Sequence, residues 1–506
     1  MKICFLSPPQ KYKNQNVSKF TSLNEFLGIG YAVSLLKSHG FQTDILYYDT
    51  ESLNSDICQQ ILEGGYTFIG FPSYYFNQIQ LARIMNFVHR NRPDAFFFLG
   101  GFLSTLSLDS FQKLKYLQCA VIGECEQTLL ELAIAIQNGD DWRKIFGLAY
   151  VEDGVLIKTA RRDLIADLDI LPFPYREPGQ HEVLPLITSR GCYGKCNYCG
   201  LNEFYRMSNG RTYRRRSPEN VVQELNELCK RHKVKHIQIS DGNFHVASRS
   251  GRDWFDEFHR LIKEQNINLT YSCYTRVNEI ISAPDLFKKF RSIGLNKIFI
   301  GVESFVQSDL DFYQKQVTVE DNIKALAIAE DLSIEYDLGI MLFNPITTPE
   351  SILEFIHTLR SINSYPNIYH IVKPISINST AIASIGTPLY SFVCDNDLQV
   401  NNIRSYKFVH CQMEVCYSII SSWSSRILPC AYKCYELESE NKCNNSDIIK
   451  ANHDLFFLDL DVIEYIAYAT QTGLLKRETD TIPVEFDLRL LNIQETLQEI
   501  EKRRIS

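Results

Sequence analysis

Short apolar runs alternate with helical repeats over the first part of the chain. The apolar runs predict five strands, at Lys2–Leu6, Phe41–Tyr48, Thr67–Pro72, Ala95–Leu99 and Ala120–Gly123. Apolar residues three and four positions apart predict helices at Phe26–His39, Ile79–Arg90 and Glu126–Gln137. Strands that alternate with helices are typical of a doubly wound parallel sheet. We therefore predict one Rossmann-like α/β domain over residues 1–140.

Candidate binding residues of this domain follow the predicted strands. Ligands of doubly wound sheets bind beyond the carboxyl ends of the strands. Those ends carry the candidates Ser7, Ser73, Tyr74, Tyr75, Gly100, Gly101, Gly123 and Glu124. Glycine allows the backbone to approach a ligand closely, although the same glycines can simply turn the chain.

A second set of strands begins after a connector. Residues 141–185 predict a small β-hairpin, from Phe146–Tyr150 and Asp153–Ile157, and then the extended, proline-containing segment Asp167–Pro174. Further strands are predicted at Leu186–Ser189, His236–Ser240, Leu269–Tyr274, Lys297–Ile300, Tyr336–Leu342 and Ile371–Ile377. Helical stretches separate them, including Asn220–Lys230 with a start signal at Ser217. Residues 186–390 therefore predict a partial, TIM-like βα barrel.

The remaining residues, 391–506, predict a mainly helical domain that covers the barrel mouth. Phe456–Ala467 is apolar with helical periodicity and predicts core, whereas Ile493–Arg504 is charged and predicts a solvated face. The region contains Cys411, Cys416, Cys430, Cys434 and Cys443. Their irregular spacing favours buried, reduced cysteines over a second metal or cluster.

Composition narrows the class of protein. The 15 cysteines show no disulfide rhythm, the N-terminus lacks a signal-peptide pattern, and no apolar stretch of ~20 residues occurs. We therefore expect a cytoplasmic protein without a membrane span. The net charge of −8 argues against nucleic acid as a partner. The basic run Arg211–Arg216 is expected to form salt bridges around the barrel or to meet cofactor phosphates.

The candidate chemistry lies in Cys192, Cys196 and Cys199, spaced C-x3-C-x2-C after the first barrel strand. A βα barrel places its chemistry at such strand ends. Three thiolates can hold three irons of a four-iron cluster and leave the fourth iron open to a small chelating ligand. A zinc site, or simple packing of the three cysteines, is the alternative.

Sequence segments before and after these cysteines resemble the radical S-adenosylmethionine (SAM) superfamily, in particular members with an N-terminal cobalamin-binding-type domain. The resemblance covers roughly residues 1–390. It rests on the cysteine loop with Tyr198 and on Phe26–Tyr31, Gly100–Thr105, Val121–Glu126, Arg190–Gly191, Tyr213–Glu219, Gly301–Ser304 and Gly386–Tyr390.

The resemblance implies a [4Fe–4S] cluster on the three cysteines whose open iron takes the amino and carboxylate groups of SAM. An electron from a flavodoxin- or ferredoxin-type donor would cleave SAM to a 5′-deoxyadenosyl radical, which abstracts hydrogen from a small-molecule or peptide substrate. By the same resemblance, backbone at Tyr198 meets the adenine, and Arg276 pairs with the SAM carboxylate. Ribose or amine contacts fall to strand-end polar residues, Asp241, Asn243, Glu303 and Ser304.

Cobalamin is the second cofactor that the resemblance implies. The chain has Gln10–Asn14 where histidine-ligated cobalamin proteins carry D-x-H-x-x-G, so no histidine of that motif can bind the cobalt. By the same resemblance, a side chain after the third predicted strand would face the cobalt, with Tyr74 or Tyr75 as the candidates, unless the pair only packs between domains.

Methylation of an unactivated carbon in a natural product or peptide is the reaction expected most within this class. Cyclisation, ring contraction or oxidation without methyl transfer remains the alternative. So does an N-terminal domain that binds no cobalamin and only docks a substrate or partner. A non-enzymatic iron–sulfur sensor is a further alternative, but it leaves the polar strand-end residues unexplained.

Overall fold

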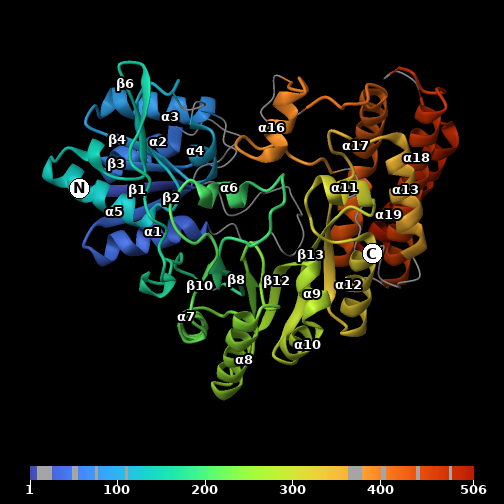
Figure 1. Ribbon diagram of the computed structural model, residues 1–506, viewed down its shortest axis with the longest axis horizontal. Helices are drawn as coiled ribbons and strands as arrows, with labels where there is room; N and C mark the ends of the chain where they lie inside the picture. The colour runs from blue at the N-terminus through green and yellow to red at the C-terminus, as the bar shows by residue number, and fades with distance from the viewer. Residues whose placement is uncertain are drawn as a thin grey trace. The chain divides into compact units, whose positions relative to one another are not determined.

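A computed structural model describes most of the chain in two compact units (Figure 1). The described residues are 1–7, 26–47, 55–73, 78–108, 112–179, 181–362, 379–400, 406–439, 445–477 and 481–505. The first unit comprises residues 1–194, 199–244 and 253–271, and the second comprises residues 195–198, 245–252 and 272–506. Each unit is described by itself below. The predicted four-domain division stays a prediction.

The N-terminal part of the first unit is a seven-stranded sheet in the order β2-β1-β3-β4-β5-β6-β7. Its strands are β1 (Lys2–Ser7), β2 (Gln42–Tyr47), β3 (Phe68–Pro72), β4 (Phe96–Gly100), β5 (Leu117–Val121), β6 (Leu148–Glu152) and β7 (Val155–Lys158). The first five pair in parallel, which confirms the predicted doubly wound sheet. The predicted connector hairpin becomes β6 and β7, and β6 pairs antiparallel with β5. The hairpin therefore covers a sheet edge that would otherwise expose unpaired backbone groups.

Helices cover both faces of this sheet, so its central strands β1, β3 and β4 are buried along almost their whole length. They are α1 (Leu27–Ser38), α2 (Ser55–Gly64), α3 (Gln78–Asn91), the short α4 (Phe102–Leu106) and α5 (Glu126–Asn138). Helices α1 and α5 share a core with Ile3 and Phe5, whereas α2 and α3 share the opposite core with Cys4 and Leu6 (Figure 1). This alternation follows the two-residue period of a strand. Helix α2 has no counterpart among the elements predicted from the sequence.

The first unit continues into the segment that carries Cys192 and Cys199. Its elements are two short 3₁₀ turns (Trp142–Lys144 and Leu168–Ile170), β8 (Val183–Leu186), β9 (Ser189–Arg190), α6 (Gly200–Arg206), β10 (Arg214–Arg215), α7 (Pro218–Arg231) and β11 (His236–Ile239). Strands β9 and β10 pair antiparallel and bracket the cysteine loop. The strand predicted at Leu186–Ser189 is thus two strands with a break. The break arises because the amides of Thr188 and Ser189 donate to the Asp241 carboxylate.

A second, five-stranded sheet has the order β14-β13-β12-β11-β8. Its other strands are β12 (Thr270–Arg276), β13 (Leu295–Glu303) and β14 (Glu335–Ile340), and the pairs β8–β11 and β13–β14 are parallel. The helices that follow the strands are α8 (Arg249–Glu264), α9 (Val277–Ser282), α10 (Pro284–Ser292), α11 (Gln307–Phe312), α12 (Val319–Asp331) and α13 (Pro349–Ser361). This sheet confirms the predicted βα architecture. The strand predicted at Ile371–Ile377 lies outside the described residues.

The C-terminal part of the second unit is helical, as predicted. It contains α16 (Pro388–Asp395), α17 (Gln412–Ser439), α18 (Asn445–Gln471) and α19 (Val484–Ile505), and α18 packs against α13, α17 and α19. Among the described residues, no helix is both long and apolar enough to cross a membrane.

Side-chain burial agrees with the prediction from the sequence in one of these helices and differs from it in another. The apolar stretch Phe456–Ala467 is core, as expected. The charged C-terminal helix is not solvated all round, because Ile493, Leu497 and Ile500 are buried on one face. Cys416, Cys430 and Cys434 are buried free thiols and Cys411 is exposed, whereas Cys443 lies outside the described residues.

Gly70 in the middle of β3 provides a test of the N-terminal core. A Cβ at this position would overlap the buried rings of Phe98 and Phe5. We expect Gly70→Ala to lower the stability of the protein by about 1–3 kcal/mol, because a close-packed core resists added volume. Thermal melting measures this change. Gly28→Ala is the control, since a Cβ there meets no atom within 4 Å and alanine favours the helix. Equal melting temperatures for Gly70→Ala and the wild type would contradict the packing described.

Candidate functional site

The cysteine loop leaves β9 through Gly191, whose φ of +84° favours glycine. A Cβ at Gly191 would overlap the carbonyl oxygen of Thr212, so glycine lets the two strands of the β9–β10 ribbon approach. In the loop, the Gly194 amide donates to Cys192 Sγ at 3.3 Å, and the Asn202 side-chain amide donates to the Gly194 carbonyl. Backbone geometry thus places a donor on the first cysteine.

Cys196 and the two residues after it belong to the second unit. The buried Cys196 Sγ accepts a hydrogen bond from Arg276 Nη1 at 3.1 Å. The Asn197 amide donates to Tyr313 O at 3.1 Å, and its side chain donates to Phe312 O at 2.6 Å. The ring of Tyr198 meets that of Tyr313 edge to face, with 5.3 Å between the centroids. The end of α11 therefore holds this part of the loop.

These donors fit a cluster site in their chemistry. Cys192, Cys196 and Cys199 are all free thiols, and two of them accept hydrogen bonds of the kind that stabilise cluster sulfurs. Across the described ranges, however, no three His, Cys, Asp or Glu side chains converge closely enough to hold a metal ion. The three-cysteine site therefore stays a prediction that rests on the spacing and on these donors.

Glu303, predicted to contact SAM, ends β13 in a strained conformation. Its φ is +69°, in the region that favours glycine, and the β13–β14 register is irregular between Gly301 and Glu303. Lys315 Nζ lies 2.6 Å from Glu303 Oε1, with both side chains largely buried. A Cβ at Gly301 would lie 2.7 Å from Glu303 Oε1 and 2.9 Å from Lys315 Nζ, so the glycine makes room for the pair. Strain of this kind costs about 1–3 kcal/mol and is concentrated at functional sites.

Lys315 is a candidate functional residue that sequence reasoning missed. It follows a short helix within Gln314-Lys-Gln316, a phrase without a recognisable motif. Only its contact with Glu303 identifies it.

Ser304, another predicted SAM contact, has its side chain in a buried hydrogen-bond network. Ser304 Oγ donates to Asp309 Oδ2 at 2.8 Å and accepts from the Val306 amide at 3.1 Å. Asp309 also accepts from Asn344, so Ser304 belongs to a buried network at the start of α11. The fourth candidate, Asn243, is buried as well.

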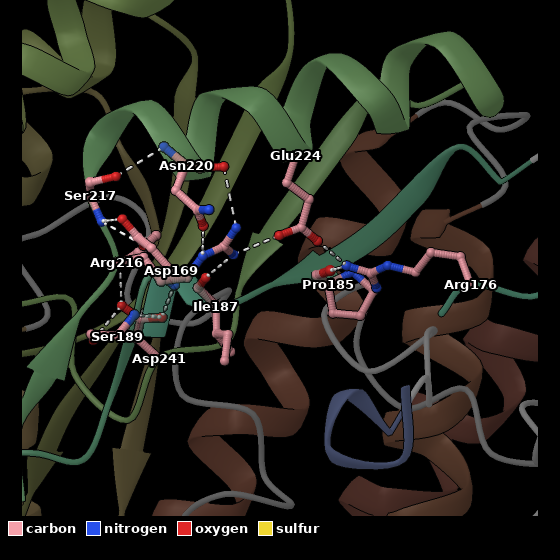
Figure 2. A network of polar contacts seen from close by, with 11 residues as sticks. Asp169, Arg176, Pro185, Ile187, Ser189, Arg216, Ser217, Asn220, Glu224 and Asp241 are labelled. Carbon is pink, nitrogen blue, oxygen red and sulfur yellow. Dashed lines mark hydrogen bonds and ion pairs between the residues drawn. The ribbon is translucent and has the colours of Figure 1, made fainter. Parts of the chain in front are cut away.

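Asp241 holds the chain that enters the cysteine loop (Figure 2). Its carboxylate accepts from the amides of Thr188 at 2.6 Å and Ser189 at 3.1 Å, and from both hydroxyls. Burial raises the pKa of Asp241, while these four hydrogen bonds act in the opposite direction. The contacts favour a positioning role for Asp241 over the predicted contact with the SAM amine.

A buried Arg–Glu–Arg triad contacts the chain just before these residues, at the end of β8. Figure 2 shows Glu224 of α7 between Arg216 and Arg176, with N–O distances of 2.6 and 2.9 Å. Arg216 also donates to Ile187 O at 2.9 Å, and Arg176 donates to Pro185 O at 2.7 Å. The salt bridging expected of the basic run is thus confirmed at Arg216, inside the unit.

Glu124, predicted to bind a cofactor, follows β5 and joins it to the β9–β10 ribbon. Its carboxylate pairs with Arg190 at 2.9 Å and Arg214 at 2.7 Å, and Arg190 also pairs with Glu126 at 2.5 Å. All four side chains are at most 9% exposed. Burial opposes the charged form of Glu124, but the charges and hydrogen bonds of Arg190 and Arg214 outweigh it and lower the pKa of Glu124. We call these four residues the charge quartet.

Two of the other N-terminal candidates, Ser73 and Gly100, meet at the strand ends. The Ser73 amide donates to Gly100 O at 2.5 Å, and Ser73 Oγ accepts from the Ser104 amide at 2.7 Å. Gly101 (φ +107°) and Gly123 (φ +74°) have backbone angles that favour glycine, and Ser7 is buried. Tyr74 and Tyr75 lie outside the described residues.

A His–Glu pair follows two strands of the second sheet and was also missed by sequence reasoning. His245 Nδ1 lies 2.6 Å from Glu279 Oε1, and the Val246 and Ala247 amides donate to Glu279 Oε2. Burial disfavours the Glu279 carboxylate, but the hydrogen bond and charge of His245 and the two amides outweigh it and lower the pKa of Glu279 to about 2. Glutamate and histidine 34 positions apart give no local signal.

Comparisons with known proteins find a family model that includes the cysteine loop. Residues 186–359 match the model of the radical SAM superfamily. Anaerobic magnesium-protoporphyrin IX monomethyl ester cyclase from Rubrivivax gelatinosus is 27% identical over 324 residues, covering 60% of this chain and 56% of the relative. An uncharacterised methyltransferase from Pyrococcus horikoshii is 24% identical over 458 residues, covering 86% of this chain and 93% of the relative. The chain thus spans about half the length of the cyclase.

A solved structure matches the fold over the whole chain. It is that of the cobalamin-dependent SAM radical enzyme OxsB with aqua-cobalamin bound, with a TM-score of 0.77 and 17% identity. The match covers 100% of this chain and 80% of OxsB. At this identity the likeness establishes the fold alone.

Glu279 predicts a pH dependence of stability. Its pKa is depressed in the folded state, so the stabilisation that it provides is complete above about pH 4.5 and is lost as the pH falls toward 2. The depression corresponds to about 3 kcal/mol. We expect Glu279→Gln to be less stable than the wild type at pH 7 and the difference to shrink below pH 4.5. Denaturant unfolding at several pH values measures this, and a difference independent of pH would contradict it.

The charge quartet predicts a large cost for Glu124→Ala. The substitution leaves Arg190 and Arg214 buried without this carboxylate, which typically costs about 3–5 kcal/mol. Glu131→Ala is the matched control, because Glu131 pairs with Arg162 in the same unit but is 40% exposed. The control is expected to cost about 0–1 kcal/mol. Chemical denaturation measures the free energy of unfolding of both variants. Similar losses in the two would show that burial of the charge quartet does not increase its contribution to stability.

Proposed function

From the radical SAM domain that this chain carries, we propose a cobalamin-dependent methyltransferase that acts on an unactivated carbon of a natural-product or peptide substrate. The N-terminal parallel sheet followed by a radical SAM domain carries this proposal. OxsB, which shares the fold over the whole chain, is described as cobalamin-dependent. The relative from Pyrococcus horikoshii, matched over nearly its full length, is named a methyltransferase.

In this proposal Cys192, Cys196 and Cys199 hold a [4Fe–4S] cluster. The cluster, when bound, supplies the electron that cleaves SAM to a 5′-deoxyadenosyl radical, and an external flavodoxin- or ferredoxin-type protein replaces that electron. The chain's own residues position and tune the site. The Gly194 amide and the Arg276 guanidinium donate to cysteine sulfurs and stabilise their negative charge.

SAM binding falls to backbone at Tyr198 and to Glu303. Lys315 holds Glu303 in its strained conformation, which leaves the second carboxylate oxygen, Oε2, to accept from a ribose hydroxyl or an ammonium group. The buried contacts of Asp241 and Ser304 give these two residues positioning roles.

Cobalamin would lie at the carboxyl ends of β1, β3, β4 and β5, where Ser7, Ser73, Gly100, Gly101 and Gly123 gather. The chain lacks the D-x-H-x-x-G motif, and by the family resemblance Tyr74 or Tyr75 would be the side chain that faces the cobalt. Glu124 pairs with Arg190 and Arg214 and so would support this edge of the sheet.

A second candidate is radical chemistry without methyl transfer, such as cyclisation. It is favoured by the cyclase relative, which matches over 60% of this chain. Both candidates share the cluster, SAM and cobalamin, and they differ in the products formed from SAM.

The proposal is tested on protein purified anaerobically with cobalamin supplied. We expect iron and corrinoid to co-purify, and we expect both 5′-deoxyadenosine and S-adenosylhomocysteine to form from SAM with a methylated substrate. Replacement of all three cysteines by alanine should abolish iron binding and SAM cleavage. Retained iron in that variant, or full cluster occupancy without corrinoid, would refute the proposal. Formation of 5′-deoxyadenosine alone with substrate would favour the second candidate.

A further inference from the structure

We infer that Arg276 is a positioning residue for the cluster, and that its guanidinium raises the cluster's reduction potential through Cys196. The inference rests on the proposed function in one respect, that Cys196 is a cluster ligand. It differs from the predicted pairing of Arg276 with the SAM carboxylate.

Two hydrogen bonds orient the guanidinium. Arg276 ends β12 at the N-cap position of α9, and it is 6% exposed. Nη1 donates to Cys196 Sγ at 3.1 Å, while Nη2 donates to the Lys315 carbonyl at 2.6 Å. A planar guanidinium with two nitrogens bound in this way has little freedom to turn away from the sulfur.

The acceptor at Lys315 is itself fixed. Its side chain pairs with Glu303, and its amide donates to Leu310 O at 3.0 Å. The neighbouring Gln314 (φ +55°) and Gln316 (φ +61°) turn the backbone sharply on either side. The Lys315 carbonyl is therefore a rigid support for Arg276.

The same short segment also holds the residue after Cys196. Asn197 donates to the Phe312 and Tyr313 carbonyls, and the Asn197 carbonyl accepts from the Leu389 amide at 3.0 Å. Residues 312–315 thus support both the sulfur's donor and the backbone that carries the sulfur. The distance from Arg276 to Cys196 is defined from both sides.

The charge of Arg276 is the reason why its hydrogen bond to Cys196 affects the reduction potential of the cluster. A charge-assisted hydrogen bond to a thiolate is stronger than a neutral one, and burial reduces the screening of the arginine charge. Reduction adds one negative charge to the cluster, so a nearby cation favours the reduced state. Hydrogen bonds to sulfur and local charge are established determinants of cluster potential. Arg276 therefore makes the electron easier to accept from the external donor.

The test is an anaerobic redox titration of the reconstituted protein, followed by electron paramagnetic resonance and performed without SAM or substrate. Arg276→Met removes the charge and both donors, Arg276→Gln keeps one neutral donor group, and Arg276→Lys keeps the charge. We expect the midpoint potential to fall in the order wild type, Lys, Gln, Met. In the Met variant the equilibrium constant for reduction of the cluster should fall at least tenfold. For one electron this lowers the midpoint potential by at least 59 mV.

Arg252→Met is the matched control. Arg252 lies in the same unit and forms a solvent-exposed pair with Asp285 at 3.0 Å, so its substitution removes an equal charge from the surface. Its potential should equal that of the wild type. A shift as large as that of Arg276→Met would overturn the inference, because net charge alone would then explain it.

Iron analysis separates this inference from the proposed function. Iron retained after loss of all three cysteines would refute the cluster assignment itself. Wild-type potential in the Arg276 variants at equal iron content would overturn only the role of Arg276. Loss of iron from Arg276→Met with unchanged potentials in the Gln and Lys variants would also overturn it, as would loss of iron from all three. A graded fall in potential at equal iron content supports it.

Discussion

Buried charge that must be compensated is the constraint on which the region around the cysteine loop depends. An uncompensated ion costs several kcal/mol in a protein interior, so each buried arginine needs a partner in a defined place. In the first unit the charge quartet and the Arg176–Glu224–Arg216 triad both end on the chain just before Cys192. The strand that leads into the loop therefore has one favourable position. That position is set by Glu124 after β5, by Glu126 at the start of α5, by Glu224 of α7 and by Arg176 of the connector.

Buried charged side chains at the strand ends of the second unit also have defined partners. Arg276 ends β12 and meets a cysteine sulfur, and Glu303 ends β13 and meets Lys315. Each of these groups is held by a contact that also fixes its neighbour, because the Lys315 carbonyl supports Arg276 while its ammonium supports Glu303. A site built in this way is preorganised, so binding energy is not spent on ordering side chains.

Much of the fold was predictable because its signals are local. Apolar runs predicted strands β1–β4 within one or two residues, and Ser217 predicted the start of α7, where its side chain caps the helix. Helix α2 was missed, and the single strand expected at Leu186–Ser189 proved to be two. The prediction of one continuous strand was wrong because the interruption depends on Asp241, which lies 52 positions away from Ser189. The connector hairpin was found, but its attachment to β5 was not, since periodicity does not record which edge a strand covers.

The features of the candidate site also fall into those that local sequence patterns predict and those that depend on distant contacts. The sequence by itself determined the cysteine spacing, the absence of a D-x-H-x-x-G motif and the set of polar residues at strand ends, because each is a local pattern. Only the tertiary structure decided their partners. It placed Arg276 on a cysteine sulfur, Glu124 on two arginines and Lys315 on Glu303, three residues whose partners no motif predicts. The physical reason is that charge compensation and hydrogen bonding act over a few ångströms of space, whatever the separation along the chain.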